Sequence, residues 1–341
     1  MIAKLRSEAG FTLAEMMIST GLLLVISSIV TSALMQMTNQ QHTIWNRTEM
    51  HSGVRGATEL LQQEVGQAGR VMLPSATGAV TLTNAINPAA GTLCTLGTPT
   101  PGVYGVPVMA TVSSTTGMFV GEWLTTLDGD ATETVYIASI TSLTTITGCF
   151  TQSHLATTTS LRALGGFATG IVAPSYPNGS TANKLKLYGD INGDGTMVYI
   201  EYYCDNGDPG TNGTFNLYRN VVQPFVPFGA AAAVKPAPDS SMVLLGNVHP
   251  NPVDAGGVSR PCFQYQEPVP ASVPGMVLDV AVTLTVWSQS KDVIDTQNYQ
   301  KETKALLNVS PRNVFFTWEF AGLGFMNRIQ PMPAAITPLL P

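Results

Sequence analysis

Charged side chains are scarce in this sequence, and basic ones are the scarcer. Only 11% of the 341 residues are Asp, Glu, Lys or Arg, and the formal net charge is −6. Nucleic-acid-binding surfaces are built from clustered Lys and Arg side chains. The composition provides no broad basic face, so we expect no nucleic-acid partner.

Signatures of catalysis are also missing. The sequence contains no Gly-x-Ser-x-Gly elbow and no Walker A string, and "LRALGGFATG" lacks the spacing of a dinucleotide-binding loop. The histidines are isolated, and the nine-residue step from His42 to His51 does not suit a metal pair; the four are His42, His51, His154 and His249. We predict a non-enzymatic protein that needs no cofactor.

Only one long hydrophobic run is present. It is "MMISTGLLLVISSIVTSALM" (Met16–Met35), and no charged residue occurs between Glu15 and Arg47. About 20 apolar residues in a helix cross a bilayer core. Lys4 and Arg6 precede the run, so the positive-inside rule predicts a single-pass membrane protein with a cytoplasmic N-terminus.

A cleaved secretory signal peptide is the main alternative for this run. "VTSA" (Val30–Ala33) offers a cleavage site of small residues. Glu15 within the apolar region argues against a signal peptide. Apolar residues also recur beyond the run at steps of three and four, which indicates one face of a continuing helix; they are Val54, Ala57, Leu61, Val65 and Ala68.

The residues before and inside the run carry a specific pattern. "KLRSEAG" followed by "FTLAEMMIS" resembles the class III signal of type IV prepilins, in which a short basic leader and Gly precede Phe-Thr-Leu-x-Glu. The resemblance implies cleavage after Gly10 by a prepilin peptidase and N-methylation of the new N-terminal residue, Phe11. It also implies that Glu15 pairs with the N-terminal amine of a neighbouring subunit during assembly. Such pairing offsets the cost of two charges in lipid.

The end of the predicted helix has a second, weaker resemblance. "MHSGVRGATELLQQEVGQAGR" (Met50–Arg70) is similar to the end of the first helix in PilW-type minor pilins and in J-type pseudopilins of type II secretion. "VTLTVWS" and "SPRNVF" are similar to the last strand of that group and the residues that follow it. Gly69 is a suitable helix stop.

After the helix, short β-branched runs alternate with Gly, Pro, Asn and Asp turns, and no second amphipathic helix is evident. From about Gly105 to Val172 the predicted strands are short and closely spaced, which indicates a small closed barrel or sandwich inserted into the main domain. The alternative is that these strands extend the main sheet.

We therefore predict an α+β fold, with a long membrane-spanning helix packed on a β-rich, pilin-like domain. The predicted segments are a leader (1–10), the helix (11–70), the pilin-like β domain (71–104 and 173–341) and the inserted β module (105–172).

Four cysteines lie in the part of the chain expected outside the membrane. An even number of cysteines in an oxidising compartment predicts two disulfides, for which three connectivities are possible. We favour pairing Cys94 with Cys149 and Cys204 with Cys262. No Cys-x-x-Cys motif occurs that would indicate a zinc or redox site.

One stretch matches a calcium-loop pattern. "DINGDGTMVYIE" places Asp190, Asn192, Asp194, Thr196 and Glu201 at the liganding positions of Asp-x-Asn-x-Asp-Gly-x5-Glu. "TMVYIEYY" reads as a strand rather than a helix, so the alternative is a hairpin turn in which Asn, Asp and Gly adopt positive φ angles.

The resemblance implies a PilW-like minor pilin that initiates or caps a type IV pilus. Its partners would be other pilins, the prepilin peptidase and the inner-membrane assembly platform. The subunit would lie in the inner membrane before assembly, and afterwards in the filament, the periplasm or on the cell surface. A type II secretion pseudopilin and a tip-located adhesin or DNA-uptake subunit are the alternatives.

Overall fold

The computed structural model describes residues 10, 12–73, 80–96, 102–103, 105–205, 215–226, 228–268, 275–291 and 298–341. The chain divides into two compact units. The first comprises Met1–Ser52 and Trp287–Lys301, and the second comprises Gly53–Val286 and Glu302–Pro341.

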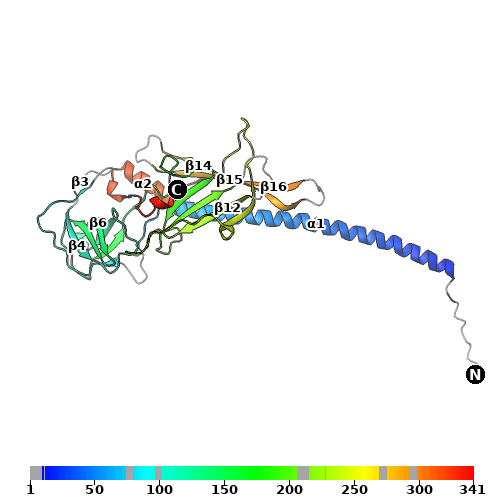
Figure 1. Cartoon of the computed structure of the whole chain (residues 1–341), viewed down its shortest axis with the longest axis horizontal. Coiled ribbons are helices and arrows are strands. Elements are labelled where there is room, and N and C mark those ends of the chain that lie inside the picture. Colours follow the sequence, from blue (N-terminus) through cyan, green and yellow to red (C-terminus); the bar gives the residue numbers. More distant parts are fainter. Residues whose placement is uncertain are drawn as a thin grey trace, which may run out of the picture. The chain divides into compact units, whose positions relative to one another are not determined.

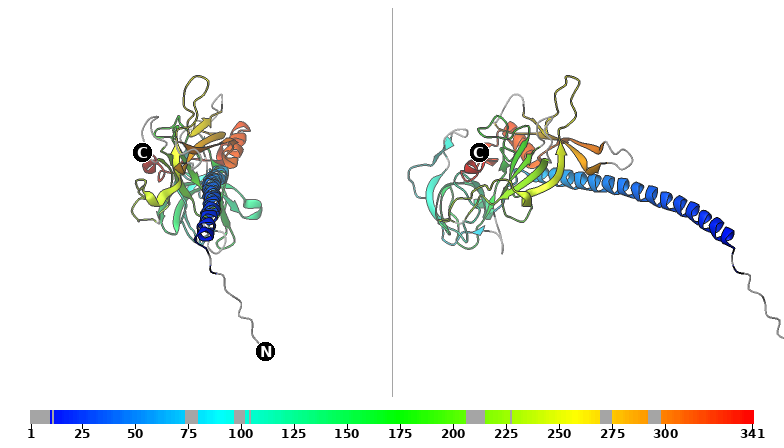
Figure 2. Two further views of the ribbon diagram at one scale, coloured as in Figure 1. Left: turned by 90° about the vertical axis from the view of Figure 1, so that its right-hand side faces the viewer. Right: turned by 45° about the vertical axis from the view of Figure 1, so that its right-hand side comes forward.

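One long helix, α1 (Leu13–Gln67), dominates the first part of the chain. It runs without a break in Figure 1 and in the right-hand view of Figure 2. From Leu13 to Thr38 every residue is exposed, although most side chains are apolar. This stretch is long and apolar enough to cross a membrane.

The second half of α1 buries one face. Val54, Ala57, Leu61, Val65 and Ala68 are each at most 2% exposed, as their three- and four-residue spacing predicts. The helix ends at Gln67, and Gly69 follows with φ of +81°. A Cβ atom there would lie 2.9 Å from Val314 Cγ2 and 3.0 Å from the Phe167 carbonyl oxygen, so glycine is required.

The first β-sheet has six antiparallel strands in the order β1-β8-β5-β6-β7-β4. Its members are β1 (Val80–Thr81), β4 (Val106–Thr111), β5 (Trp123–Leu127), β6 (Thr134–Ser142), β7 (Thr145–Phe150) and β8 (Ser160–Ala163). A separate two-stranded hairpin joins β2 (Thr95–Leu96) to β3 (Gly102–Val103).

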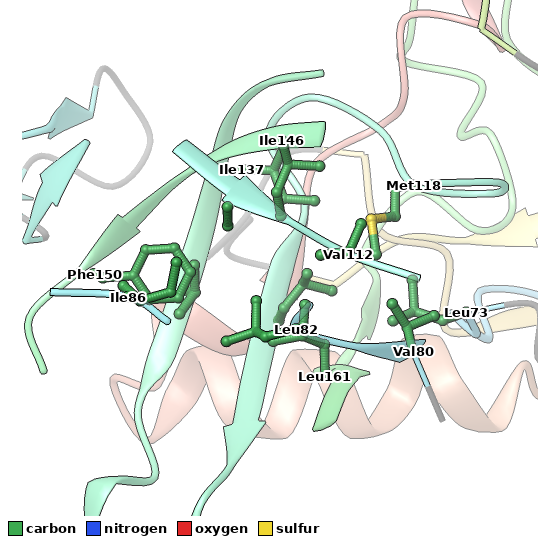
Figure 3. Packing of buried hydrophobic residues seen from close by; sticks show 13 residues of the cluster. Leu73, Val80, Leu82, Ile86, Val112, Met118, Ile137, Ile146, Phe150 and Leu161 are labelled. Carbon is green, nitrogen blue, oxygen red and sulfur yellow. The ribbon is translucent and has the colours of Figure 1, made fainter. Parts of the chain in front are cut away.

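The two edges of this sheet meet, so it closes into a small barrel. Leu82 forms a bridge with Val112, and the Thr83 N–H donates to the Thr111 carbonyl at 2.7 Å. The apolar side chains of the strands point toward one another inside the barrel (Figure 3). Leu82, Leu124, Ile137, Ile146 and Phe150 are fully buried there. The interior is a packed core, as in other barrels of this size.

The barrel departs from the predicted module (105–172) at both ends. It begins at Val80, because β1 pairs with β8, and it ends at Ala163. Residues Gly166–Phe167 form β9, which pairs with a C-terminal strand outside the barrel. The pairing of a two-residue strand with a partner 80 residues away leaves no periodic signal in the sequence.

The second sheet is antiparallel, with the path β10-β11-β12-β13-β15-β14, and β16 also pairs with β15. Its strands are β10 (Lys184–Gly189), β11 (Val198–Cys204), β12 (Phe215–Val222), β13 (Val243–His249), β14 (Phe263–Gln266), β15 (Asp279–Lys291) and β16 (Tyr299–Val309). The short 3-10 helices are η1 (Gly129–Ala131), η2 (Ser240–Met242), η3 (Met326–Arg328) and η4 (Thr337–Leu339).

A second α-helix corrects the expectation that none follows α1. It is α2 (Arg312–Gly322), and it buries Val314 and Thr317. Its sequence, "RNVFFTWEFAG", is rich in aromatic residues with high strand propensity, so local composition favoured a strand. Packing of the buried side chains decides the structure here.

The C-terminal segment links the barrel to the second sheet. β17 (Ile329–Gln330) pairs in parallel with β9 (Gly166–Phe167). The buried Gln330 side chain accepts a hydrogen bond from the Trp123 N–H at 2.9 Å and donates to the Trp123 carbonyl at 2.8 Å. Beyond it, Ile336 and Leu339 join the core that contains Tyr188 and Tyr199 of the second sheet.

An ion pair between the buried Glu64 and the partly buried Arg219 connects α1 to the second sheet. Glu64 is 3% exposed, and it receives hydrogen bonds from the Tyr202 hydroxyl and from the Arg219 guanidinium, whose Nε lies 3.1 Å from Glu64 Oε1. Burial of a carboxylate is tolerated only when its charge and lone pairs are satisfied. These two partners satisfy Glu64.

We expect Arg219→Ala to lower the free energy of unfolding by about 3 kcal/mol, because it leaves the Glu64 carboxylate buried without its counter-charge. Arg55→Ala is the matched control. Arg55 also pairs with a glutamate, Glu59, but both side chains are more than 60% exposed, and loss of a pair of this kind costs at most about 1 kcal/mol. Urea denaturation of the detergent-solubilised chain measures both, and equal effects would contradict the anchoring role of Glu64.

A second buried carboxyl group lies directly before β5 of the barrel. Glu122 is fully buried; its Oε2 accepts from the Phe119 N–H at 3.2 Å, and its Oε1 has no hydrogen-bond partner among the described atoms. Burial raises the pKa of Glu122 well above its usual range. The unfolded chain therefore loses this proton at lower pH than the folded chain, and stability falls as pH rises above about 4.

Glu122→Gln should raise the melting temperature at pH 7 and leave it nearly unchanged at pH 3, where the wild-type carboxyl is protonated in both states. Glu319→Gln, at an exposed position of α2, is the control and should change neither value. Thermal denaturation at the two pH values measures the difference. An equal shift at both would show that ionisation of Glu122 is not the cause.

Candidate functional site

The N-terminal end of α1 is the strongest candidate site. Gly10 and Thr12 are described and exposed, whereas Phe11 and residues 1–9 lie outside the described part of the chain. Glu15 stands in the first turn of α1 and is exposed. It is the last charged residue before Arg47.

Glu15 forms a capping box with Thr12. The Glu15 N–H donates to Thr12 Oγ1 at 3.3 Å, and the Thr12 N–H donates back to Glu15 Oε2 at 3.0 Å. The Thr12 hydroxyl also donates to the same oxygen at 3.0 Å. Two N–H groups that the helix itself leaves unpaired are thereby satisfied.

The capping box gives Glu15 a structural role that sequence analysis missed. The signal was present, because Thr12-Leu13-Ala14-Glu15 before an apolar run is the Thr-x-x-Glu signature. The carboxylate also lies at the positive end of the helix dipole, which favours a negative charge. Its exposed position leaves it accessible to a cation from another molecule.

The five residues of the calcium-loop pattern do not converge on one point. Asp190 is fully buried at the start of the β10–β11 connection, where its Oδ1 accepts from the Gly195 N–H at 3.3 Å and its Oδ2 lies 3.6 Å from Arg70 Nε. Asp194 accepts from the Thr196 N–H at 2.7 Å, and Asn192 is exposed. These contacts are typical of a tight turn.

Glu201 belongs to a different cluster. It lies in β11, three residues beyond Val198 at the loop end of the hairpin, which is about 10 Å along a strand. Its Oε2 accepts from Lys235 Nζ at 2.7 Å and from the Tyr199 hydroxyl at 3.0 Å. Within the described residues there is no group of three His, Cys, Asp or Glu that could hold a metal.

Two glycines support the hairpin alternative for this loop. Gly193 and Gly195 have φ of +72° and +84°, which glycine adopts readily. The turn is built from these two residues and the Asp190 contacts.

The two disulfides join Cys94 to Cys149 and Cys204 to Cys262. This is the pairing favoured from the sequence. The first bond ties the segment after Ile86 to β7 of the barrel, and the second ties β11 to the segment before β14.

One histidine that looked isolated has charged neighbours. His154 is buried; its Nδ1 lies 3.1 Å from Asp128 Oδ2, and its Nε2 lies 2.8 Å from Glu133 Oε1. Each ring nitrogen therefore faces a carboxylate oxygen. The hydrogen bond from His154 lowers the pKa of Asp128. Both ring nitrogens are occupied, so this cluster braces the barrel and offers no free base.

No family model, curated protein or solved structure matches the chain.

The loop geometry predicts that millimolar calcium leaves the melting temperature of the chain unchanged, because Arg70 already faces Asp190 and Lys235 already neutralises Glu201. Asp190→Ala with Asp194→Ala should lower the melting temperature by the same amount with and without calcium. A calcium-dependent rise that the double variant abolishes would contradict this account and establish an ion site.

Proposed function

We propose that this chain is a type IV prepilin-like filament subunit of the PilW-like minor pilin kind, without enzymatic activity. The observation that carries the proposal is Glu15, an exposed carboxylate in the first turn of a helix whose next charged residue is Arg47. A charge at the edge of a membrane-spanning segment is costly unless it has a partner. The Gly-Phe-Thr-Leu-x-Glu string supplies the reason for its position.

Two further features support the proposal. The first half of α1 has no protein packed against it, so it is available to lipid first and to neighbouring helices later. The chain after α1 is β-rich and held by two disulfides, which suits a domain in an oxidising compartment. The subunit would wait in the inner membrane with its N-terminus in the cytoplasm, and its partners would be other pilins and the assembly platform.

The barrel favours a position at the filament tip. It is a closed module with its own core, in addition to the second sheet. A head of this size would crowd a filament shaft, so we place the subunit at the tip, where it primes or caps assembly. A tip-located adhesin or uptake subunit is the second candidate, because a separate closed module is a common place for a binding surface. A type II secretion pseudopilin would use the same N-terminal helix and the same glutamate, Glu15.

Three substitutions separate the assembly role of Glu15 from its capping role. Glu15→Gln keeps the capping box but loses the charge, since Gln also completes the motif. Glu15→Val loses both, and Thr12→Ala weakens the cap but keeps the charge. If the charge serves assembly, recovery in sheared filaments should fall roughly tenfold or more for both Glu15 variants, because hydrogen bonds to charged groups are worth about 1.5–3 kcal/mol.

Thr12→Ala should assemble at close to the wild-type level, and all three variants should reach the membrane in normal amounts. The opposite pattern, with Glu15→Gln assembling normally and Thr12→Ala failing, would reduce Glu15 to a helix cap. Normal recovery of Glu15→Val would remove both roles.

A further inference from the structure

Residues 287–291 of β15 and 299–301 of β16, which together we call the hairpin end, lie against α1 within the first unit. Asn46 Nδ2 donates to Ser290 Oγ at 2.9 Å, and Arg47 Nε donates to Gln300 Oε1 at 3.2 Å. Gln289 Nε2 donates to Glu49 Oε1 at 3.1 Å. These three hydrogen bonds join the two strands to a single turn of the helix. They therefore fix the position of the hairpin along α1.

The same hairpin end carries aromatic and basic side chains together. The rings of Trp287 and Tyr299 stack with centroids 5.7 Å apart. Lys301 Nζ lies 4.3 Å from the centre of the Trp287 ring, and Lys291 Nζ lies 5.9 Å from that of Tyr299. Tyr299 and both lysines are exposed. Trp, Tyr and Lys are the side chains that favour the boundary between a bilayer and water.

The position of this cluster along α1 matches that boundary. With 1.5 Å of rise per residue, the helix extends about 43 Å from Met16, beside Glu15, to Trp45. A bilayer with its headgroup layers is about 40–45 Å thick. Trp45 is 74% exposed although it lies beyond the apolar run. The hairpin is attached at Asn46–Glu49, within about one turn of Trp45.

We infer that residues 287–291 of β15 and 299–301 of β16, with Trp45, form a lipid-contact surface that rests in the headgroup layer of the bilayer spanned by α1, on the side opposite Glu15. It sets the depth of the unassembled subunit in the membrane. The inference rests on one part of the proposed function, namely that α1 spans a membrane. It does not require that the chain assembles into a pilus.

The charge balance indicates which property of the lipid matters. In the sequence, residues 46–49 and 287–301 contain three basic side chains (Arg47, Lys291, Lys301) and three acidic ones (Glu49, Asp292, Asp295), of which Asp292 and Asp295 lie outside the described residues. Long-range attraction to anionic lipid therefore contributes little. The aromatic rings and the lysine stems favour the interface itself, so zwitterionic phosphatidylcholine suffices as the partner.

The test places the full chain in phosphatidylcholine vesicles and measures tryptophan quenching. Replacing Trp45, Trp123 and Trp318 with Phe leaves Trp287 as the only reporter. We expect a nitroxide on the lipid headgroup to quench Trp287 strongly, and a nitroxide deep in the acyl chain to quench it little. Addition of phosphatidylglycerol should leave the quenching unchanged.

The matched control keeps Trp318 of α2 as the only tryptophan, and it should be quenched by neither nitroxide. Quenching of Trp287 as weak as that of Trp318 would overturn the inference, as would quenching seen only with anionic lipid. Loss of quenching from Lys291→Gln with Lys301→Gln would support it further, since the lysines help hold the rings at the interface.

A second measurement avoids removing tryptophans. All native cysteines are in disulfides, so Lys291→Cys or Leu323→Cys accepts a single environment-sensitive dye, and only the first should respond to headgroup nitroxide. A dye at Leu24→Cys reports whether α1 is in the bilayer. If Leu24 is buried in lipid and Lys291 is not near headgroups, the inference fails alone; if Leu24 is also outside lipid, the membrane-spanning proposal fails with it.

Discussion

The helix α1 meets two different surroundings along its length, and the rest of the chain is arranged around that constraint. From Leu13 to Thr38 no side chain is covered by the protein, so these apolar residues require lipid or another helix. From Val54 to Ala68 one face is fully buried. Glu64 within that half is tolerated because Arg219 and Tyr202 satisfy it. One continuous helix therefore joins an exposed apolar segment, long enough to cross a membrane, to a face that is buried in the protein.

The C-terminal segment joins the barrel to the second sheet. The Gln330 side chain makes hydrogen bonds to the backbone N–H and carbonyl of Trp123 in the barrel, and β17 pairs with β9 next to the end of α1. Its last residues then enter the core of the second sheet. The C-terminal segment thus contacts both the barrel and the second sheet.

The sequence was most informative where the signal was local or strictly periodic. The buried face of α1, its end near Gly69 and the turn character of the Asp190 loop followed from spacing and residue type. Pairing over long sequence distances was not accessible, so β1 of the barrel and the contact of Asp190 with Arg70 were missed. The helix α2 was missed because its aromatic residues favour strands locally.

The sequence identified the key residue of the candidate site, but it did not predict the hydrogen bonds that this residue makes. Glu15 was identified by its position in an uncharged stretch, whereas its reciprocal hydrogen bonds with Thr12 appeared only in the structure. The calcium pattern matched in letters, but Glu201 lies along a strand and binds Lys235. A motif whose last ligand falls on a strand of a hairpin cannot fold back around an ion.

We propose that the chain is processed as a prepilin, and the mass of the mature protein tests this proposal most directly. The chain should be produced together with a prepilin peptidase, purified from membranes and analysed by intact and N-terminal peptide mass spectrometry. The account predicts loss of residues 1–10 and a mature N-terminus at Phe11 that carries one methyl group. A mature N-terminus near Leu34, after "VTSA", would identify an ordinary signal peptide, and an unprocessed chain would equally contradict the account.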